Sequence, residues 1–258
     1  MSVQFTNIQL DSIDGQECLG KGSQGVVCVH RGNKELAIKR LRNGKLVDLL
    51  REAKIVSMVY RCKVLVNIEE QWIIIPRIYD RELFDVVQER RYNIGPLTTE
   101  NLHIVGQQLL LQLKELHQLK IAHLDVKLEN IMIDGSNFAK GCRLRLIDFG
   151  VAELISSDKQ RDSKTRGTEM YFPPEMVRDG SFSTATDMWC MAIMMMAAAT
   201  MCRVPTIRTD NDVRTFLLEC PNNLSSEMVD ILLKLLKQDP KDRLTAEEAL
   251  GLWEKVTL

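Results

Sequence analysis

The sequence predicts an α+β fold with two lobes, a small β-rich lobe followed by a larger, mainly helical lobe. Two observations in the 258 residues support this prediction. Short runs rich in β-branched residues, separated by turn-forming residues, fill the first third of the chain. After residue 80, long segments space their apolar residues at the helical period instead. We therefore expect one lobe at 1–78 and the other at 79–258, with a cleft between them.

The small lobe is expected to contain several strands and one helix. One strand-like run begins at Gly25 and another covers 35–41, and the turn-like residues 31–34 separate them. The segment KLVDLLREAKIVSMV (45–59) has apolar residues at helical spacing and charges on the other face, which predicts a helix. The runs KVLVNI (63–68) and WIIIPRI (72–78), joined by the polar residues EEQ, predict a β-hairpin.

The larger lobe is expected to be built around two helices. Residues 98–119 form a long amphipathic pattern, and Thr98 or Thr99 is the predicted N-cap. Short strands are predicted around NIMID (130–134) and RLRLIDF (143–149). The longest apolar stretch, 189–202, is too short to span a bilayer and predicts a buried core helix.

Composition excludes several classes of partner and location. The formal net charge is −1, so the basic excess of a general nucleic-acid or acidic-membrane binder is missing. The seven cysteines include no Cys-x-x-Cys pair, which argues against structural zinc and favours a reducing compartment. The first residues lack the basic start and apolar run of a signal peptide. We expect a cytoplasmic or nuclear protein that binds neither nucleic acid directly nor membranes.

The segment GKGSQGVV matches G-x-G-x-x-G-x-V at Gly20, Gly22, Gly25 and Val27. The same pattern describes a dinucleotide-binding turn, but that turn must open a helix, whereas this one continues as a strand. A glycine-rich hairpin over phosphates fits better, because glycines let backbone N–H groups approach the oxygens closely. A hairpin without a ligand is the alternative for this segment taken alone.

Lys39 lies in the run LAIKRL, between apolar neighbours of a predicted strand. A lysine on a half-buried surface needs an anionic partner, because an unpaired buried charge is costly. Phosphate oxygens are one candidate partner, and Glu52 on the following helix is another. A solvated lysine on an edge strand is the alternative.

The loop HLDVKLEN (123–130) carries groups suited to phosphoryl transfer. Asp125 can accept or orient a hydroxyl proton, and Lys127 can neutralise a moving phosphoryl group. Asn130 offers a neutral oxygen to Mg²⁺, and eighteen residues further Asp148 in LIDFG offers an anionic one. An isolated Asp-Phe-Gly is also common turn chemistry, and an isolated Asp-x-Lys is also a surface pair. Their order and spacing together favour the functional interpretation.

At this point the chain resembles eukaryotic-type protein kinases over nearly its whole length. Further segments carry the resemblance, namely GTEMYFPPE (167–175), DMW (187–189) and DPKDRLTAEEAL (239–250). Lysine at position 127 resembles the serine/threonine pattern. The resemblance implies one kinase domain over 1–258, with the bilobal kinase fold, one regulatory helix in the small lobe and an activation segment at 148–175. It also implies transfer of the γ-phosphoryl group of ATP to Ser/Thr hydroxyls of a protein substrate.

The resemblance implies a role for each matching residue. ATP would be bound by Gly20, Gly22, Gly25, Val27, Ala37, Lys39 and Glu82. Lys39 would also pair with Glu52, Asp125 would be the catalytic base, and Lys127 would stabilise the transferring phosphate. Asn130 and Asp148 would hold Mg²⁺ or Mn²⁺. Thr168 and Glu129 would belong to the substrate pocket, and the structural residues would be His123, Glu175, Asp187 and Arg243, with Asp187 anchoring the catalytic loop.

Three departures from the family pattern stand out. Leu124 replaces the arginine that captures a phosphorylated activation-segment residue in many kinases, so a phosphate on Ser163 or Thr165 loses its bidentate partner. Our hypothesis is that activity does not require this phosphorylation. The segment Pro173-Pro174-Glu175 and Ala192 are conservative replacements of the family's residues. The chain is also short between Lys39 and Glu52, so we expect control by a partner, by dimerisation or by expression level.

Glu82 and Glu129 occupy positions where kinases that prefer basic substrates carry acids. We therefore expect arginine two or three residues before the substrate Ser/Thr, with solvated surface acids as the alternative. In its compactness the chain is similar to small kinases of large insect DNA viruses. Two other functions stay open, a pseudokinase that binds nucleotide or a partner without transfer, and a small-molecule kinase. The simultaneous presence of Lys39, Asp125, Asn130 and Asp148 argues against the first, and GTEMYFPPE argues against the second.

Overall fold

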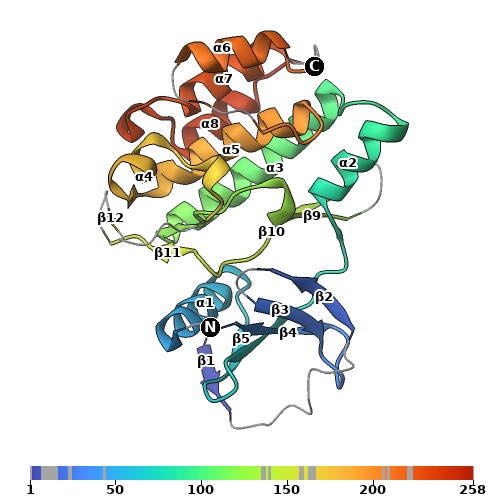
Figure 1. The fold of residues 1–258 in the computed structure, drawn as a ribbon, viewed down its shortest axis with the longest axis vertical. Coiled ribbons are helices and arrows are strands. Elements are labelled where there is room, and N and C mark those ends of the chain that lie inside the picture. The colour runs from blue at the N-terminus through green and yellow to red at the C-terminus, as the bar shows by residue number, and fades with distance from the viewer. Residues whose placement is uncertain are drawn as a thin grey trace. The chain divides into compact units, whose positions relative to one another are not determined.

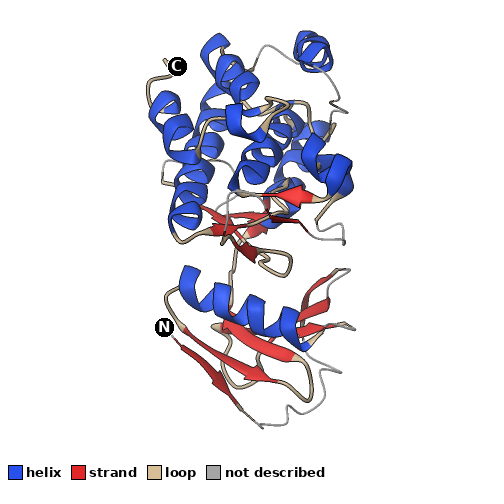
Figure 2. Cartoon of the chain, turned by 90° about the vertical axis from the view of Figure 1, so that its left-hand side faces the viewer, coloured by secondary structure: helices blue, strands red, loops and turns tan. Residues whose placement is uncertain are grey.

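The computed structural model describes residues 2–6, 17–22, 25–42, 45–134, 138, 141–156, 160–161, 167–204, 207, 210–219 and 223–257. The chain forms two compact units (Figure 1). Unit 1 comprises Met1–Tyr79 and Phe149–Glu153, and unit 2 comprises Asp80–Asp148 and Leu154–Leu258. Strands make up most of the first unit and helices most of the second (Figure 2), as the α+β prediction requires.

Unit 1 contains a six-stranded sheet in the order β1-β5-β6-β4-β3-β2. Its strands are β1 (Ser2–Phe5), β2 (Cys18–Lys21), β3 (Gly25–Val29), β4 (Leu36–Leu41), β5 (Lys63–Asn67) and β6 (Trp72–Pro76). The predicted hairpin of β5 and β6 is confirmed. Strand β1 runs parallel to β5, whereas the other neighbouring strands are antiparallel. The sequence did not predict β1.

The predicted helix of unit 1 is α1 (Leu46–Val59). Its buried face consists of apolar residues, Ser57 and one acid, Glu52. Lys39 and Ile38 are consecutive on β4, so their side chains lie on opposite faces of the sheet. Ile38 belongs to a buried cluster with Trp72 and Ile74. Lys39 therefore lies on the other face, where a charged residue needs a partner.

Unit 2 is mainly helical. Its α-helices are α2 (Leu83–Asn93), α3 (Thr99–Gln118), α4 (Pro174–Asp179), α5 (Thr184–Ala199), α6 (Asp210–Glu219), α7 (Ser226–Leu235) and α8 (Ala246–Trp253). Short 3₁₀ turns occur at η1 (Leu128–Asn130), η2 (Glu169–Tyr171) and η3 (Pro240–Asp242). The remaining strands are short: β7 (Arg81–Glu82), β8 (Ile121–Ala122), β9 (Ile131–Ile133), β10 (Leu144–Leu146), β11 (Glu153–Leu154), β12 (Gln160–Arg161) and β13 (Ser181–Phe182).

The two central helices of unit 2 follow the predictions. Helix α3 has Thr98 as its N-cap, and the Thr98 hydroxyl accepts the N–H of Asn101 at 3.2 Å. Helix α5 is buried at every position from Thr186 to Ala199. It ends before the predicted residue 202, because Met201 and Cys202 take left-handed backbone conformations with φ of 56° and 70°.

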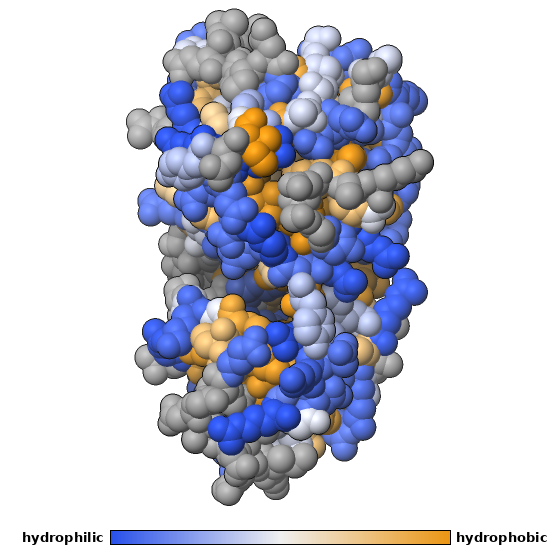
Figure 3. Space-filling model, turned by 90° about the vertical axis from the view of Figure 1, so that its right-hand side faces the viewer, coloured by the Kyte–Doolittle hydropathy of each residue, from blue (hydrophilic) through white to orange (hydrophobic). Residues whose placement is uncertain are grey.

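Figure 3 shows one face of the molecule, on which hydrophilic residues cover most of the coloured area. On the face that Figure 3 shows, hydrophobic residues form small areas among charged and polar ones. In the part of the chain that the structure describes, no helix is long and apolar enough to cross a membrane. Helix α5, which contains most of the longest apolar stretch of the sequence, is buried in unit 2, as predicted.

Candidate active site

The glycine-rich hairpin joins β2 to β3 in unit 1. Gly22 donates its N–H to the carbonyl of Gly25 at 3.0 Å. A Cβ at Gly25 would lie 2.1 Å from the carbonyl oxygen of Arg40, so only glycine fits there. A Cβ at Gly20 or Gly22 would meet nothing within 4 Å, so both backbones border open space. The N–H of Gly22 is used within the hairpin, and the open space beside Gly20 and Gly22 gives a phosphate room to approach the backbone.

Val27, Ala37 and Lys39 share one face of the sheet of unit 1. Val27 lies opposite Lys39 in the antiparallel pair of β3 and β4, and Ala37 is two residues from Lys39 on the same strand. The sheet thus presents two small apolar side chains beside one ammonium group. This arrangement suits an adenine nucleotide, which has an apolar base and a charged phosphate chain.

Lys39 and Glu52 form a buried ion pair. Lys39 Nζ lies 2.6 Å from Glu52 Oε1, and the exposed fractions of the two side chains are 6% and 2%. Burial of two charges is favourable only when they are closely paired. The pair therefore fixes α1 against β4, at the position that the kinase resemblance implied.

Arg51, the neighbour of Glu52 on α1, binds the segment that follows Asp148. One guanidinium nitrogen donates to the carbonyl of Gly150 at 3.0 Å, and the other lies 3.2 Å from a carboxylate oxygen of Glu153. The second nitrogen also donates to Asp48 at 2.7 Å. Sequence reasoning missed these contacts, because an arginine on the charged side of a predicted helix indicates a solvated residue.

Phe149 packs against the same helix. Its ring meets the ring of Tyr60 edge to face, with centroids 6.0 Å apart, and Phe149 is only 2% exposed. Residues Phe149–Glu153 therefore belong to unit 1 by their contacts.

In unit 2, Asp125 lies at the centre of a hydrogen-bonded cluster. Its Oδ1 accepts the hydroxyl of Thr168 at 2.7 Å, and its Oδ2 accepts Nδ2 of Asn130 at 2.8 Å. Lys127 Nζ lies 2.9 Å from Oδ2 and donates to the Thr168 oxygen at 2.7 Å. The structure thus brings together four predicted residues that are up to 43 positions apart in the sequence.

Asn130 and Asp148 offer the oxygen ligands that a hard divalent cation prefers. The Nδ2 group of Asn130 donates to both the carbonyl and the carboxylate of Asp125, which orients the amide oxygen away from them. The backbone of Asn130 accepts the N–H of Ile147, the residue before Asp148, at 2.9 Å. Asp148 itself has a left-handed backbone, with φ of 64°. The donor set fits Mg²⁺ or Mn²⁺.

Asp187, on α5, holds the backbone of the catalytic loop. Its fully buried carboxylate accepts the N–H groups of His123 and Leu124, each at 2.8 Å. His117 Nε2 lies 2.9 Å from the same carboxylate. The ring of His123 reaches the carbonyl of Ile147 at 2.9 Å and so joins the loop to the strand before Asp148.

Glu175 and Arg243 form a second buried ion pair, in unit 2. Both guanidinium nitrogens of Arg243 bind the carboxylate, at 2.6 and 2.7 Å. Arg243 also donates to the carbonyls of Lys237 and Ala185. The pair links α4 to the segment before α8, so its role is in the fold rather than in chemistry.

Glu82 and Glu129 lie in an acidic part of unit 2. Burial raises the pKa of Glu82, and the negative charges of Asp85 and Glu129 raise it further. In the same area, burial and next the charge of Glu129 raise the pKa of Cys202 to about 11. The negative potential around Glu129 favours a cation.

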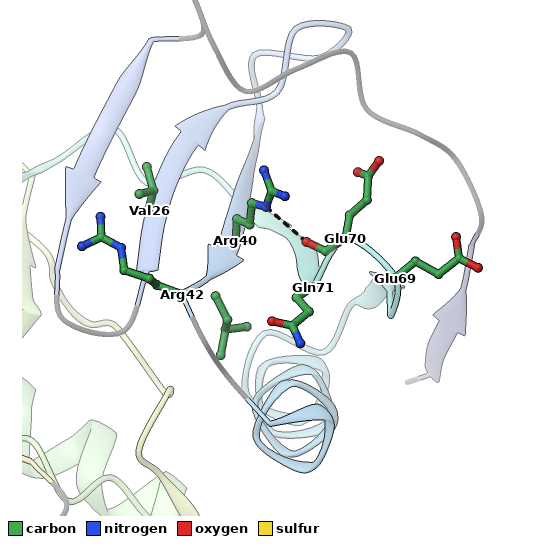
Figure 4. Close-up of a pocket in the computed structure, with 7 residues that line it drawn as sticks. Val26, Arg40, Arg42, Glu69, Glu70 and Gln71 are labelled. Atoms are coloured by element: carbon green, nitrogen blue, oxygen red, sulfur yellow. Dashed lines mark hydrogen bonds between the residues drawn. The ribbon is translucent and has the colours of Figure 1, made fainter.

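The pocket in Figure 4 lies elsewhere in unit 1. Its side chains come from β3, β4, the residue after β4 and the turn between β5 and β6, and they are Val26, Arg40, Leu41, Arg42, Glu69, Glu70 and Gln71. Val26 and Arg40 are opposite each other in register, on the sheet face that Lys39 does not share. Arg40 donates to the carbonyl of Glu70 at 3.2 Å. The two arginines and two glutamates compensate each other, so the pocket does not indicate a site for a charged nucleotide.

Phosphoryl transfer requires groups that bind phosphates and a carboxylate that orients the attacking hydroxyl. The structure contains an open glycine hairpin, the buried Lys39 and the carboxylate of Asp125, which is bonded to Lys127 and Thr168. Together with the two-unit α+β fold, they define the class of the protein as a protein kinase.

The comparison with known families agrees. The protein kinase domain family matches residues 14–252, and the chain belongs to this family. Ribosomal protein S6 kinase alpha-4 of Homo sapiens is 26% identical over 269 residues, which cover 93% of this chain and 34% of that protein. RAC-beta serine/threonine-protein kinase of Homo sapiens is 27% identical over 261 residues, covering 92% and 51%. Serine/threonine-protein kinase PAK 5 of Rattus norvegicus is 25% identical over 253 residues, covering 90% and 34%.

All three relatives are named as serine/threonine or ribosomal protein kinases, and the pattern around Lys127 resembles the serine/threonine pattern. The chain spans about a third to a half of the length of these three relatives.

Proposed function

We propose that the chain transfers the γ-phosphoryl group of ATP to serine or threonine hydroxyls of a protein substrate. The observation that supports this most strongly is the cluster around Asp125. Of the four acceptor positions on its carboxylate, Thr168, Asn130 and Lys127 occupy three. The described residues leave one position to accept the proton of a substrate hydroxyl, which is what a catalytic base must do.

The other residues take the roles that phosphoryl transfer demands. The glycine hairpin and Lys39 bind the phosphates, and Glu52 keeps the Lys39 ammonium in place. Asn130 and Asp148 would hold Mg²⁺ or Mn²⁺, which supplies neutralisation of the phosphate charge when bound. Lys127 would stabilise the charge that moves with the phosphoryl group, since its ammonium is already fixed beside Asp125.

The test is transfer of labelled phosphate from Mg-ATP to a basic Ser/Thr protein substrate, with Asp125→Asn as the comparison. Transfer by the native chain and its loss in the variant, with nucleotide binding retained in both, is the expected result. Binding without transfer in the native chain would favour a pseudokinase instead. No nucleotide binding by a folded chain would contradict the proposal.

We further propose that activity does not require phosphorylation of the activation segment. Leu124 is 1% exposed and apolar, so it offers no cation to a phosphate. Arg51 already binds the carboxylate of Glu153 and the carbonyl of Gly150. The carboxylate of Glu153 therefore already pairs with Arg51, a basic side chain that could otherwise pair with a phosphate.

Ser163 and Thr165, the expected phosphorylation sites, lie outside the residues that the structure describes. Their joint replacement by alanine should leave turnover by folded protein intact. Loss of turnover in the double variant, with its unfolding temperature unchanged, would contradict this part of the proposal.

We also propose that the preferred substrates carry arginine before the target hydroxyl. The supporting observation is Glu129, whose Oε2 is buried and receives no hydrogen bond from the described residues. The charges of Asp85 and Glu129 raise the pKa of Glu82 after burial does, which indicates negative potential in this area. A peptide array should show enrichment of arginine two or three residues upstream of the target. A flat array would leave Glu82 and Glu129 as surface acids.

A further inference from the structure

Two cysteines lie directly opposite each other at the base of the glycine-rich hairpin. Cys18 on β2 pairs in antiparallel register with Cys28 on β3. Cys18 is exposed, whereas Cys28 is 2% exposed. Side chains directly opposite in an antiparallel pair lie on the same face of the sheet. One thiol is thus accessible to solvent reagents, and the other is held beneath it.

The hydrogen-bonding pattern between β2 and β3 places Cys18 and Cys28 at a position suited to a disulfide. The adjacent rung is hydrogen-bonded, because Val29 donates its N–H to the carbonyl of Glu17 at 2.9 Å. Rungs of an antiparallel ladder alternate, so Cys18 and Cys28 form a non-hydrogen-bonded pair. In such pairs the Cα atoms are about 4.5 Å apart and the Cβ atoms are close. A disulfide needs Cα atoms about 4.4–6.8 Å apart, so little strand movement is required.

The electrostatics of the pair agree with this register. Burial raises the pKa of Cys28, and the neighbouring Cys18 raises it next. The register thus places an exposed thiol and a buried thiol beside each other.

We propose that Cys18 and Cys28 are a redox modification site that hydroperoxides convert into a cross-strand disulfide. The peroxide O–O bond breaks, Cys18 sulfur gains the terminal oxygen as a sulfenic acid, and an alcohol or water leaves. The Cys28 sulfur then attacks Cys18, the S–O bond breaks, and the hydroxyl leaves as water with the Cys28 proton. Two thiols are oxidised and one hydroperoxide is reduced. A dithiol restores the original pair by exchange.

The disulfide acts on the glycine-rich hairpin. The Cys18 thiol donates to the carbonyl of Gly20, the first glycine, at a sulfur–oxygen distance of 3.6 Å. Oxidation removes this proton, so Gly20 loses the contact. The register shift between Cys18 and Gly20 lies next to the new bond, which limits how the strand can adjust. This consequence rests on the proposed function, since it assumes that the hairpin binds ATP.

The experiment treats the reduced full chain with hydrogen peroxide, blocks remaining thiols by alkylation and maps peptides by mass spectrometry without reductant. The expected product is a Cys18–Cys28 linked peptide that lacks two hydrogen atoms and disappears with dithiothreitol. Mg-ATP affinity should fall about threefold to tenfold on oxidation and return on reduction, the range expected for one lost hydrogen bond in a binding loop. The mapping does not depend on kinase activity, so it separates this proposal from the proposed function.

Cys18→Ser is the informative variant, because its hydroxyl can still donate to Gly20 while no disulfide can form. Its nucleotide affinity should not respond to peroxide. Cys62→Ser, which removes a half-buried cysteine elsewhere in unit 1, should respond as the native chain does. Two mapping results would contradict the modification site. In one, Cys28 is alkylated while Cys18 is over-oxidised; in the other, Cys18 or Cys28 is bridged to a different cysteine. A Cys18–Cys28 bridge with unchanged nucleotide affinity would overturn its effect on the hairpin.

Discussion

The carboxylate of Asp187 accepts the backbone N–H of Leu124 at 2.8 Å while Leu124 adopts a left-handed backbone with φ of 65°. A non-glycine residue in this region costs about 1–3 kcal/mol, so surrounding contacts must enforce it. Asp187 contributes through its second oxygen as well, which accepts the N–H of His123. Gly167 packs closely against Leu124 as well, since a Cβ at position 167 would lie only 2.3 Å from the Leu124 carbonyl oxygen. The loop at 123–130 is therefore held from two sides, by the carboxylate of Asp187 and by the backbone at Gly167.

Asp187→Asn should distort the loop and weaken the fold. Asparagine is neutral and keeps one acceptor oxygen, so both buried N–H groups lose a charged partner and one of them loses its acceptor. We expect the free energy of unfolding to fall by about 2–4 kcal/mol. We also expect kcat to fall more than the KM for ATP rises. Chemical denaturation and steady-state kinetics measure both. Asp230→Asn, an exposed residue of α7, is the control and should change neither; equal effects of the two variants would contradict the argument.

Thr168 is predicted to position Asp125 and Lys127. Its hydroxyl donates to one and accepts from the other, so Thr168→Val removes both bonds at nearly constant volume. We expect kcat to fall about 10- to 100-fold, as for other misplaced catalytic groups, with the KM for ATP nearly unchanged. Thr168→Ser keeps the hydroxyl and should recover most of the activity. If Thr168→Ser were as inactive as Thr168→Val, activity would depend on the methyl group of Thr168 and not on its hydroxyl.

Local patterns predicted the main elements because each one satisfies its own periodicity. The 45–59 pattern became α1, and the Thr98 cap and the apolar spacing after it became α3. Strand β1 was missed because Ser2–Phe5 pairs with β5, whose residues lie far along the sequence, and no local signal shows that pairing.

In the candidate site, too, the sequence predicted the residues of local motifs and missed those that depend on distant contacts. Asp125, Asn130 and Lys39 were found because their motifs are short and ordered. Arg51 was not found, because its contacts to Gly150 and Glu153 join positions about 100 residues apart. The opposition of Cys18 and Cys28 depends on strand register, which one residue of slippage would reverse.

Arg51 is predicted to set turnover without touching substrate. Arg51→Ala breaks the contacts of α1 to Gly150 and Glu153, so Glu52 and the segment after Asp148 lose a common support. We expect kcat to fall about tenfold, with smaller change in KM for ATP. Lys54→Ala, an exposed position on the same helix, is the matched control. Glu153→Gln should show a smaller loss than Arg51→Ala, because the bond to Gly150 remains. The reverse order would place the main contribution at Glu153.

Arg243→Lys should destabilise unit 2 although the charge is kept. A lysine ammonium cannot reproduce the two-pronged bond to Glu175 or the further bonds to Lys237 and Ala185. Because the pair is buried, the expected loss in the free energy of unfolding is about 2–4 kcal/mol. Arg178→Lys, whose side chain is 62% exposed, is the same substitution at the surface and should be nearly neutral. Similar unfolding midpoints for both variants would show that the fork is dispensable.

The preference for basic substrates should depend on pH through Glu82. Burial and the charges of Asp85 and Glu129 raise its pKa, so Glu82 takes up a proton at a higher pH than an ordinary glutamate. A protonated Glu82 cannot pair with arginine. The KM for an arginine-containing peptide should therefore rise about threefold to tenfold as the pH falls through this raised pKa, the size expected for one partly exposed ion pair. The KM ratio to a matched peptide without arginine removes the pH dependence of the other residues. Glu82→Gln should flatten this ratio, and a ratio that still changes with pH in the variant would assign the effect to Glu129 or Asp85 instead.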